Sequence, residues 1–390
     1  MLKFKSVTVR GVVIMNSVKI LHCADIHIGA AESFLSTAER RKFERIITFE
    51  RIIDKAKENS VQVIAIAGDL FDFNGVENGL ADPVFEKIAS VPEIKVIFAA
   101  GNHDPLTADS PFKTRLLPDN LYVLGTHDDC ITFDELKLRV YGKSFENVYM
   151  SGEERFSATP TDDDYINLMV IHGELKSDLN SQYNPITPKF VKSCKMDYIA
   201  LGHVHKNTEI GRIGNTFFAY CGCPEGRGFD ELGEKGVYMG EISKGSCELE
   251  FVPICKRRYI YEKIDITTLT SSVDICGKIL SALKEENGAE FAENLYKIEL
   301  TGLLPDDLSI NLHEISSRIS EEVYFAKIKD STETKIDFEK LSGEITLKGL
   351  FVKNMLAKID NSSEEEKELL NKALNLGLKA FNSEVEYNED

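Results

Sequence analysis

Long apolar runs, paired cysteines and an excess of basic residues are all missing from this 390-residue sequence. No apolar stretch approaches the ~20 residues that cross a bilayer, so the sequence predicts no membrane span. The eight cysteines are spread along the chain, and Cys221 and Cys223 form a C-x-C pair without the second pair that a zinc site needs. We therefore expect reduced, mostly buried thiols, as in a cytoplasmic protein.

Positive charge is in deficit, because 46 Lys and Arg residues stand against 64 Asp and Glu, giving a formal net charge of -18. A free-standing protein that binds duplex DNA is usually basic, since neutralisation of phosphates supplies most of its non-specific affinity. The acidity argues against tight unaided DNA binding. It leaves a nucleic-acid substrate open, because metal ions or a partner could supply positive charge.

The first residues, MLKFKSVTVRGVVIMNS, combine basic residues with a short apolar run, as a signal peptide does. Arg10 interrupts that run, however, and no small-residue cleavage site follows. We expect that the reading frame begins at Met15 and that residues 1–17 are an N-terminal extension.

Alternating strand-like and helical patterns in the first 105 residues predict an α/β core. The expected strands there are 18–25, 61–69 and 95–102, and the expected helices are 39–60 and 83–90. From about Asn120 strands dominate, with runs at 120–125, 130–142, 165–173, 196–203, 215–222 and 235–242. A strand-rich half of this kind predicts two sheets that pack face to face under helices.

After Cys255 the pattern changes to that of a small separate α/β domain, with strands at 259–267 and 294–302 and helices at 272–286 and 308–323. Two amphipathic helices close the chain, and their apolar faces are Phe351/Met355/Ile359 and Leu370/Leu374/Leu378. Ser363 and Glu366 have the spacing of a capping box. The predicted domains are 18–255, 256–345 and 346–390.

Polar residues follow five of the expected strands. In chain order they are Asp25 and His27 (CADIHIG), Asp69 and Asp72 (AGDLFD), Asn102 and His103 (GNHD), His172 (VIHGE), and His203 and His205 (LGHVHK). Residues two apart on a strand point to the same face, which would pair Asp25 with His27 and His203 with His205. Each motif alone is common, but the ordered set of five is a strong signal. Carboxylate and amide oxygens with imidazoles suit Mn²⁺, Fe or Zn²⁺. The number of ligands suits two metals that share a carboxylate, about 3.5–4 Å apart.

The motifs DIHIG, GDLFD, GNHD, HGE and GHVH together resemble those of the calcineurin-like metallophosphoesterases. More narrowly, they resemble the DNA-repair nuclease branch that contains Mre11, SbcD and the YhaO-type exonucleases, and YCGCPEGRGFDELGEKGVY is most similar to the YhaO type. The resemblance covers 18–255. It implies a four-layer α/β/β/α sandwich with the site at the strand ends, followed by a small capping domain.

The resemblance also implies a role for each polar residue. One metal would be held by Asp25, His27 and His205, the other by Asn102, His172 and His203, and Asp69 would bridge both. His103 would assist the leaving oxygen rather than bind metal. Asp72 would orient His103, with a simple turn residue as the alternative. Arg227 and Lys206 are weaker candidates for phosphate contacts, and Glu174 for support of His172.

These roles imply a two-metal, most readily Mn²⁺-dependent, cytoplasmic DNA repair nuclease that hydrolyses phosphodiesters. The resemblance also implies that an ATPase of the Rad50 or SbcC class docks on the closing helices. The sequence leaves undecided whether the protein forms a homodimer. One alternative is a metallophosphatase or nucleotide phosphodiesterase. Protein phosphatases of the superfamily continue G-D-x-x-D with Arg-Gly and read G-N-H-E, unlike GDLFDFNG and GNHD here. The other alternative, a non-catalytic scaffold, is disfavoured by the intact set of ligands.

Overall fold

The computed structural model describes residues 16–30, 38–72, 79–153, 155–161, 164–305, 310–334 and 337–381. The chain forms two compact units, residues 1–261 with 292–296, and residues 262–291 with 297–390. None of the helices in the described ranges is long and apolar enough to cross a membrane. The expected start at Met15 lies outside these ranges, and the three-domain division of the sequence stays a prediction.

Two six-stranded sheets build the first unit. The first has the order β12 (Ser246–Pro253), β11 (Gly236–Ser243), β1 (Ser17–Cys23), β2 (Val63–Ile66), β3 (Lys95–Phe98) and β4 (Leu121–Val123). The second has the order β5 (Asp129–Phe133), β6 (Leu138–Lys143), β7 (Ile166–His172), β8 (Tyr198–Gly202), β10 (Thr216–Tyr220) and β9 (Gly211–Ile213). Neighbours from β1 to β4 and from β6 to β8 are parallel, so their carboxyl ends lie at one edge of each sheet.

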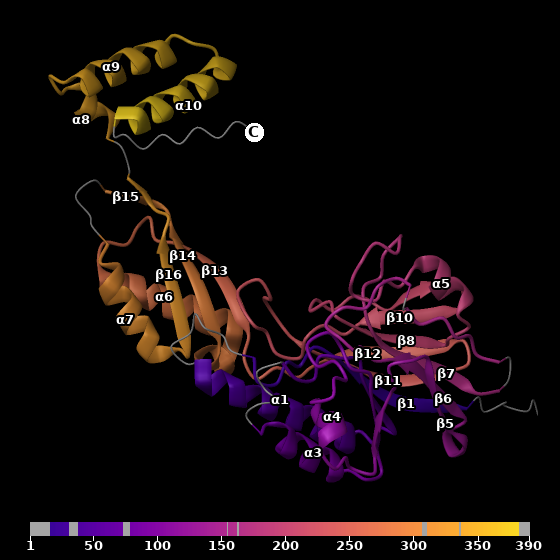
Figure 1. Cartoon of the computed structure of the whole chain (residues 1–390). Helices are drawn as coiled ribbons and strands as arrows, with labels where there is room; N and C mark the ends of the chain where they lie inside the picture. The colour runs from indigo at the N-terminus through magenta and orange to yellow at the C-terminus, as the bar shows by residue number, and fades with distance from the viewer. Residues whose placement is uncertain are drawn as a thin grey trace, which may run out of the picture. The chain divides into compact units, whose positions relative to one another are not determined.

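Side-chain alternation along the strands divides the core of this unit into layers. In β7, Leu168 and Val170 pack between the two sheets, whereas Met169 and Ile171 pack on the opposite side with Val191 of α5 (Pro188–Ser193). Helices α1 (Ala38–Glu58) and α3 (Ala81–Ala89) cover the outer face of the first sheet, where the short helix α4 (Pro111–Thr114) also lies (Figure 1). The predicted four-layer α/β/β/α sandwich is therefore confirmed.

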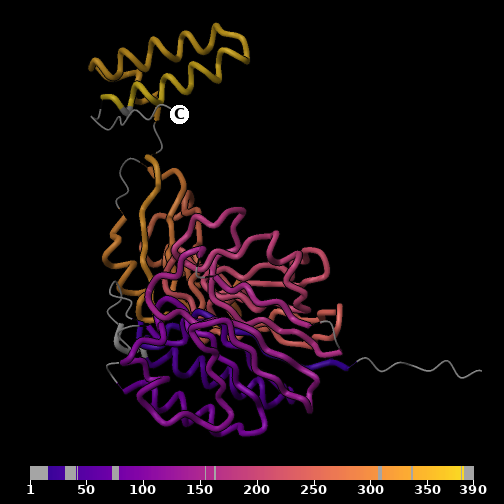
Figure 2. The backbone as a smooth tube through the Cα atoms, turned by 45° about the vertical axis from the view of Figure 1, so that its right-hand side comes forward, coloured from indigo at the N-terminus to yellow at the C-terminus, as the bar shows by residue number. Residues whose placement is uncertain are grey.

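The second unit contains most of a three-stranded sheet and two groups of helices. The sheet has the order β13 (Tyr259–Asp265), β14 (Leu295–Thr301) and β16 (Phe325–Asp330), beside a short pair of β15 (Leu303–Leu304) and β17 (Glu333–Thr334). The helices are α6 (Ser272–Asn287), α7 (Leu312–Glu322), α8 (Phe338–Ser342), α9 (Leu347–Asp360) and α10 (Glu364–Phe381). Helices α9 and α10 lie side by side (Figures 1 and 2).

The closing helices bury the apolar faces that the sequence indicated. Val352, Leu374 and Leu378 form a small core, and Phe351, Met355 and Ile359 pack against it. Glu366 Oε2 accepts from the Ser363 backbone N–H at 3.2 Å, and Ser363 Oγ accepts from the Glu366 N–H at 3.4 Å, which confirms the capping box.

One expected strand is wrong, because residues 130–142 form two strands. β5 and β6 pair antiparallel around a 3₁₀ turn, η1 (Asp134–Leu136). Lys137 adopts φ +48°, a left-handed conformation that reverses the chain. The apolar positions change from odd numbers (Ile131, Phe133) to even numbers (Leu136, Leu138, Val140) at this turn, a break in the period that the expectation of one strand overlooked. The sequence analysis also missed five strands and three short helices of the described ranges: β9, β12, β15, β16, β17, α4, α5 and α8.

A buried network of four charged side chains holds α1 against the chain near residues 225 and 257. Arg41 Nη1 lies 3.0 Å from carboxylate oxygens of both Glu44 and Glu225, and Arg257 Nη2 lies 2.8 Å from Glu44 Oε1. All four are 2% exposed or less. Burial would raise the pKa of Glu44, but hydrogen bonds from Arg257 and Arg41 lower it to about 2.

We expect that Glu44→Gln reduces the free energy of unfolding by about 3–5 kcal/mol, because it leaves two buried arginines short of their counter-charge. The pKa of Glu44 is lower in the folded than in the unfolded chain. Its contribution is therefore complete above about pH 4.5, the ordinary value, and is lost as the pH falls toward 2. Urea unfolding at several pH values measures both effects. The exposed Glu58→Gln is the control, with a change within about 0.5 kcal/mol; equal losses in the two variants would contradict the prediction.

Candidate metal centre

Four of the five polar motifs follow their strands instead of lying on them, and only His172 ends a strand, β7. β1 ends at Cys23 and β8 ends at Gly202. Asp25 and His27, like His203 and His205, therefore lie beyond their strands, and the expectation that strand alternation aligns each pair is wrong. Instead, Asp25, His27, Asp69 and His203 have φ of +54°, +51°, +53° and +101°. Left-handed backbone costs a non-glycine residue roughly 1–2 kcal/mol and is concentrated at functional sites.

Backbone hydrogen bonds hold these turns together. Asp25 N–H donates to Gly68 O at 3.1 Å, and His27 N–H donates to Asp69 O at 2.9 Å. Gly68 has φ +87°, and a Cβ there would lie 2.4 Å from His172 Nδ1. Only glycine therefore lets the turn after β2 approach the end of β7.

The seven residues predicted as metal ligands meet at this point. Ligand atoms of Asp25, His27 and His205 lie within 4.8 Å of one another, as do those of Asp25, Asp69 and His172. Asn102 Oδ1 is 3.0 Å from His172 Nε2. The ring of His203 is centred 5.2 Å from that of His172. Their assignment as ligands stays a prediction, with this convergence in its favour.

The electrostatics of this cluster fit divalent cations. Asp25 and Asp69 are buried side by side, and burial, followed by the charge of Asp69, raises the pKa of Asp25 well above its usual value. Burial lowers the pKa of His27, His172 and His203, in the last case to about 4. Neutral imidazoles are the form that binds metal, and adjacent buried carboxylates need a counter-charge. Nδ1 of His27 is also buried without a hydrogen-bond partner in the described chain.

His103 and Asp72 lie at the rim of the cluster. His103 Nδ1 is 3.0 Å from Asp72 Oδ1, and a third of the His103 side chain is exposed. The hydrogen bond to Asp72 raises the pKa of His103. The His103 ring centre lies 4.7 Å from that of His27, at 89°. This places a partly exposed imidazole next to the buried residues, while the catalytic roles of His103 and Asp72 stay predictions.

Sequence reasoning gave no role to Asp104, which ties two of the turns together. Its carboxylate accepts backbone N–H groups of Gly101 at 2.8 Å, Phe71 at 3.1 Å and Asp69 at 3.2 Å. Burial, and then the charge of Asp69, raises the pKa of Asp104. Its position at the end of GNHD was the only local signal.

Glu231 and Glu174 each lie against one of the histidines. Glu231 Oε1 is 2.6 Å from His205 Nδ1, a contact across 26 residues with no local signal in the sequence. Glu174, which the sequence suggested as a supporting residue, has its Oε1 3.5 Å from His203 Nε2. Both carboxylates can orient the ring that they touch.

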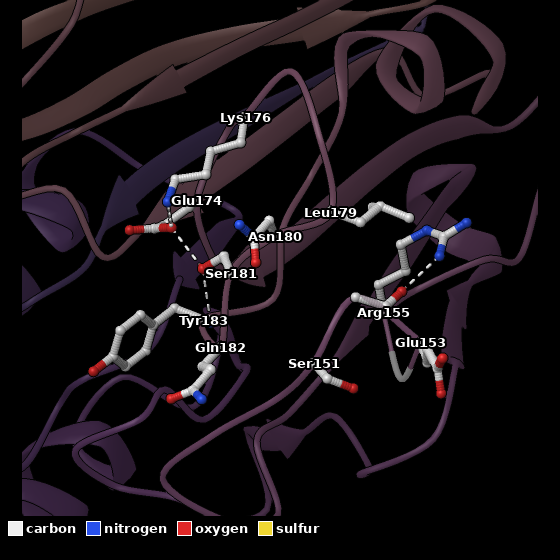
Figure 3. Close-up of a pocket in the computed structure, with 11 residues that line it drawn as sticks. Ser151, Glu153, Arg155, Glu174, Lys176, Leu179, Asn180, Ser181, Gln182 and Tyr183 are labelled. Atoms are coloured by element: carbon white, nitrogen blue, oxygen red, sulfur yellow. Dashed lines mark hydrogen bonds and ion pairs between the residues drawn. The ribbon is translucent and has the colours of Figure 1, made fainter.

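A pocket of about 780 Å³ opens beside His203. Its lining comes from the loops that follow β6 and β7: Ser151, Gly152, Glu153, Arg155, Glu174, Lys176, Leu179, Asn180, Ser181, Gln182 and Tyr183 (Figure 3). The Tyr183 ring stacks on the ring of His203 with 5.0 Å between centres. Two residues of the pocket lining, Glu174 and Tyr183, therefore contact His203 of the histidine cluster.

Comparison with known proteins gives a consistent picture. Residues 18–207 match the family model described as calcineurin-like phosphoesterase. Among the relatives is a DNA double-strand break repair protein Mre11 of Methanopyrus kandleri, 26% identical over 60% of this chain and 57% of that one. The uncharacterized metallophosphoesterase YhaO of Bacillus subtilis is 26% identical over 61% and 60%. Mre11 of Sulfurisphaera tokodaii is 24% identical over 91% and 92%.

The chain thus spans less than two thirds of the length of the first two relatives. A crystal structure of TT1561 of Thermus thermophilus aligns over 62% of this chain and 99% of that one, with a TM-score of 0.39 and 10% identity. That likeness is too weak to add to the fold described above.

We expect Asp69→Ala to lower the metal content of the purified protein and to abolish phosphodiester hydrolysis, because Asp69 is the candidate bridge. Asp69→Asn should do the same without the backbone cost, since asparagine tolerates positive φ. Metal analysis by mass spectrometry after dialysis measures the effect, with the exposed Asp109→Ala as control. Two bound metals and full turnover in both Asp69 variants would show that the assignment is wrong.

Proposed function

We propose that this protein is a two-metal phosphodiesterase that cleaves DNA, since residues 18–207 match the family model described as calcineurin-like phosphoesterase. The convergence of seven ligand-type residues, with His103 and Asp72 at their rim, carries the proposal. Carboxylate, amide and imidazole donors together suit Mn²⁺, with Fe and Zn²⁺ as alternatives. We place this activity in DNA repair and in the cytoplasm.

The residues divide into two sets around a shared carboxylate. Asp25, His27 and His205 would hold one ion, Asn102, His172 and His203 the other, and Asp69 both. Two divalent ions at such a site lower the pKa of a water nucleophile and neutralise the phosphate charge. Asn102 and Asp69 also belong to the turns that Asp104 fixes, which limits movement of the site.

His103 would protonate the leaving oxygen. Asp72 Oδ1 lies 3.0 Å from His103 Nδ1, a contact that can orient the imidazole ring. General acid help of this kind contributes typically about 10²–10⁴-fold to the rate. The accessible position of the ring at the rim supports this role over a structural one.

DNA as the substrate is suggested by several relatives that are named DNA double-strand break repair proteins. With two dications the formal charge would still be strongly negative, so any positive track for the backbone must be local. Arg155 and Lys176 in the pocket beside His203 offer such local charge. The serine, asparagine and glutamine side chains that line this pocket can donate hydrogen bonds to a nucleotide or accept them from it.

A direct assay tests the proposal: the purified protein is incubated with labelled single- and double-stranded DNA in Mn²⁺, Mg²⁺ or chelator. We expect cleavage with Mn²⁺ and none with chelator. Hydrolysis of a phosphomonoester, but not of DNA or bis(p-nitrophenyl) phosphate, would favour the metallophosphatase alternative. Bound metals without hydrolysis of any phosphoester would favour the scaffold.

A variant of His103 should behave differently from variants of the predicted ligands. His103→Ala should keep both metals yet lose about 10²–10⁴-fold in turnover, because the lost group acts on the leaving oxygen. The matched control is His127→Ala, a histidine outside the site. Loss of an ion from His103→Ala would contradict the proposed role.

An ATPase of the Rad50 or SbcC class is the proposed partner, with α9 and α10 as its docking segment. Packing between these helices uses only part of their apolar surface. Four leucines stay largely exposed: Leu347, Leu350, Leu369 and Leu376. An amphipathic helical surface of this kind can enter a groove on a partner.

We expect that removal of the chain from Leu347 onward leaves hydrolysis of a small phosphodiester nearly unchanged and abolishes partner binding and the partner's stimulation of DNA cleavage. Since truncation exposes the rest of the helical core, the double variant Leu350→Asp/Leu369→Asp is the milder test and should lose binding too. Asn354→Asp on α9 is the matched control. Co-purification of the truncated protein with the ATPase would contradict the docking role.

A further inference from the structure

The segment from Cys223 to Glu231, here called the 223–231 loop, joins β10 to β11 and is fixed at both ends by buried or half-buried carboxylates. At its start, Glu225 is fully buried and accepts from Arg41 Nη1 at 3.0 Å and Thr48 Oγ1 at 2.9 Å. Both donors lie on α1. The start of the loop is therefore held by a helix that packs on the first sheet.

At the end of the loop, the two oxygens of Glu231 serve different partners. Oε1 lies 2.6 Å from His205 Nδ1. Oε2 accepts the backbone N–H of Arg227 at 2.8 Å and the thiol of Cys223 at 3.4 Å. Burial would raise the pKa of Glu231, but the hydrogen bond and charge of His205 lower it to about 2. One carboxylate thus joins a candidate metal ligand to the loop.

Arg227 lies between these two anchors. Its backbone is fixed by Glu231, and its side chain is half-buried. Within the described ranges its guanidinium has no hydrogen-bond or ion-pair partner. Burial, followed by the positive charge of Arg227, lowers the pKa of His27, so Arg227 lies close enough to act on the cluster. The planar guanidinium of Arg227 can donate two parallel hydrogen bonds, a geometry that matches two oxygens of a phosphate group.

We propose that Glu231 is a positioning residue with two tasks: it orients His205 toward a metal ion through Oε1, and through Oε2 it holds the 223–231 loop so that Arg227 contacts a phosphate oxygen of the substrate. This inference rests on the proposed function, since His205 must be a metal ligand. A carboxylate on the far nitrogen of a ligating histidine fixes its tautomer and ring angle. Because the same side chain positions both His205 and Arg227, it fixes the place of the metal ion relative to the place of the phosphate.

Glu231→Gln tests the first task. A glutamine has one acceptor oxygen, so it can keep the contact with His205 or with Arg227, not both. We expect Mn²⁺ affinity to fall about 10–100-fold, measured by titration of free Mn²⁺ with electron paramagnetic resonance. The absorption spectrum of the Co²⁺-loaded protein should change as well. Glu234→Gln, an exposed neighbour in sequence, is the control and should leave both readouts unchanged. A lower melting temperature with wild-type Mn²⁺ affinity and Co²⁺ spectrum would overturn the positioning role.

Arg227→Ala tests the second task. It should keep wild-type Mn²⁺ affinity, raise the inhibition constant of inorganic phosphate roughly 10-fold and raise KM for bis(p-nitrophenyl) phosphate similarly. Arg227→Lys should recover part of the loss. Unchanged phosphate inhibition in Arg227→Ala would overturn the contact. These readouts use no DNA, so a protein that binds Mn²⁺ and phosphate but leaves DNA uncut would refute the proposed substrate and still decide the roles of Glu231 and Arg227.

Discussion

Two carboxylates buried side by side, Asp25 and Asp69, impose the constraint on which the rest of this structure depends. Adjacent negative charges in the interior need cations close by, and the surrounding histidines are driven by burial to their neutral, metal-binding form. The chain holds this unfavourable arrangement with left-handed turns and with the backbone hydrogen bonds of Asp104. The stability that these features cost is offset by the large apolar cores on both sides of the two sheets.

Around that centre, charged side chains are layered by distance. Ligand-type residues lie innermost, His103 with Asp72 lies at the accessible rim, and Glu231 and Glu174 lie behind individual histidines. Farther out, the network of Arg41, Glu44, Glu225 and Arg257 connects α1 to the 223–231 loop. The same network that stabilises the fold therefore fixes one end of a loop that reaches the site. In this chain, stability and site geometry share several of their contacts.

The strong negative charge is consistent with this layering. Acidic residues outnumber basic ones in the chain, and the basic residues near the site, among them Arg227, Arg155 and Lys176, are individually placed. A phosphate ester would then be held by local contacts and by bound cations, and not by a broad basic surface. The exposed leucines of α9 and α10 belong to the second unit and offer a separate, apolar means of recruiting a partner.

The sequence by itself determined the α/β class, the order of most strands, the capping box at Ser363 and the set of polar residues that meet at the strand ends. These features follow from local periodicity and from short motifs, which a single chain displays directly. Only the tertiary structure decided how they meet. Left-handed turns, and not strand alternation, align Asp25 with His27; a hairpin divides residues 130–142; Glu174 lies against His203; and Glu231 reaches His205. The contacts of Glu174 and Glu231 depend on packing between segments far apart in the chain, and the left-handed turns depend on a backbone conformation that residue type does not dictate, so neither leaves a periodic signal in the sequence. The hairpin does shift the apolar period, but its turn depends on the left-handed backbone of Lys137.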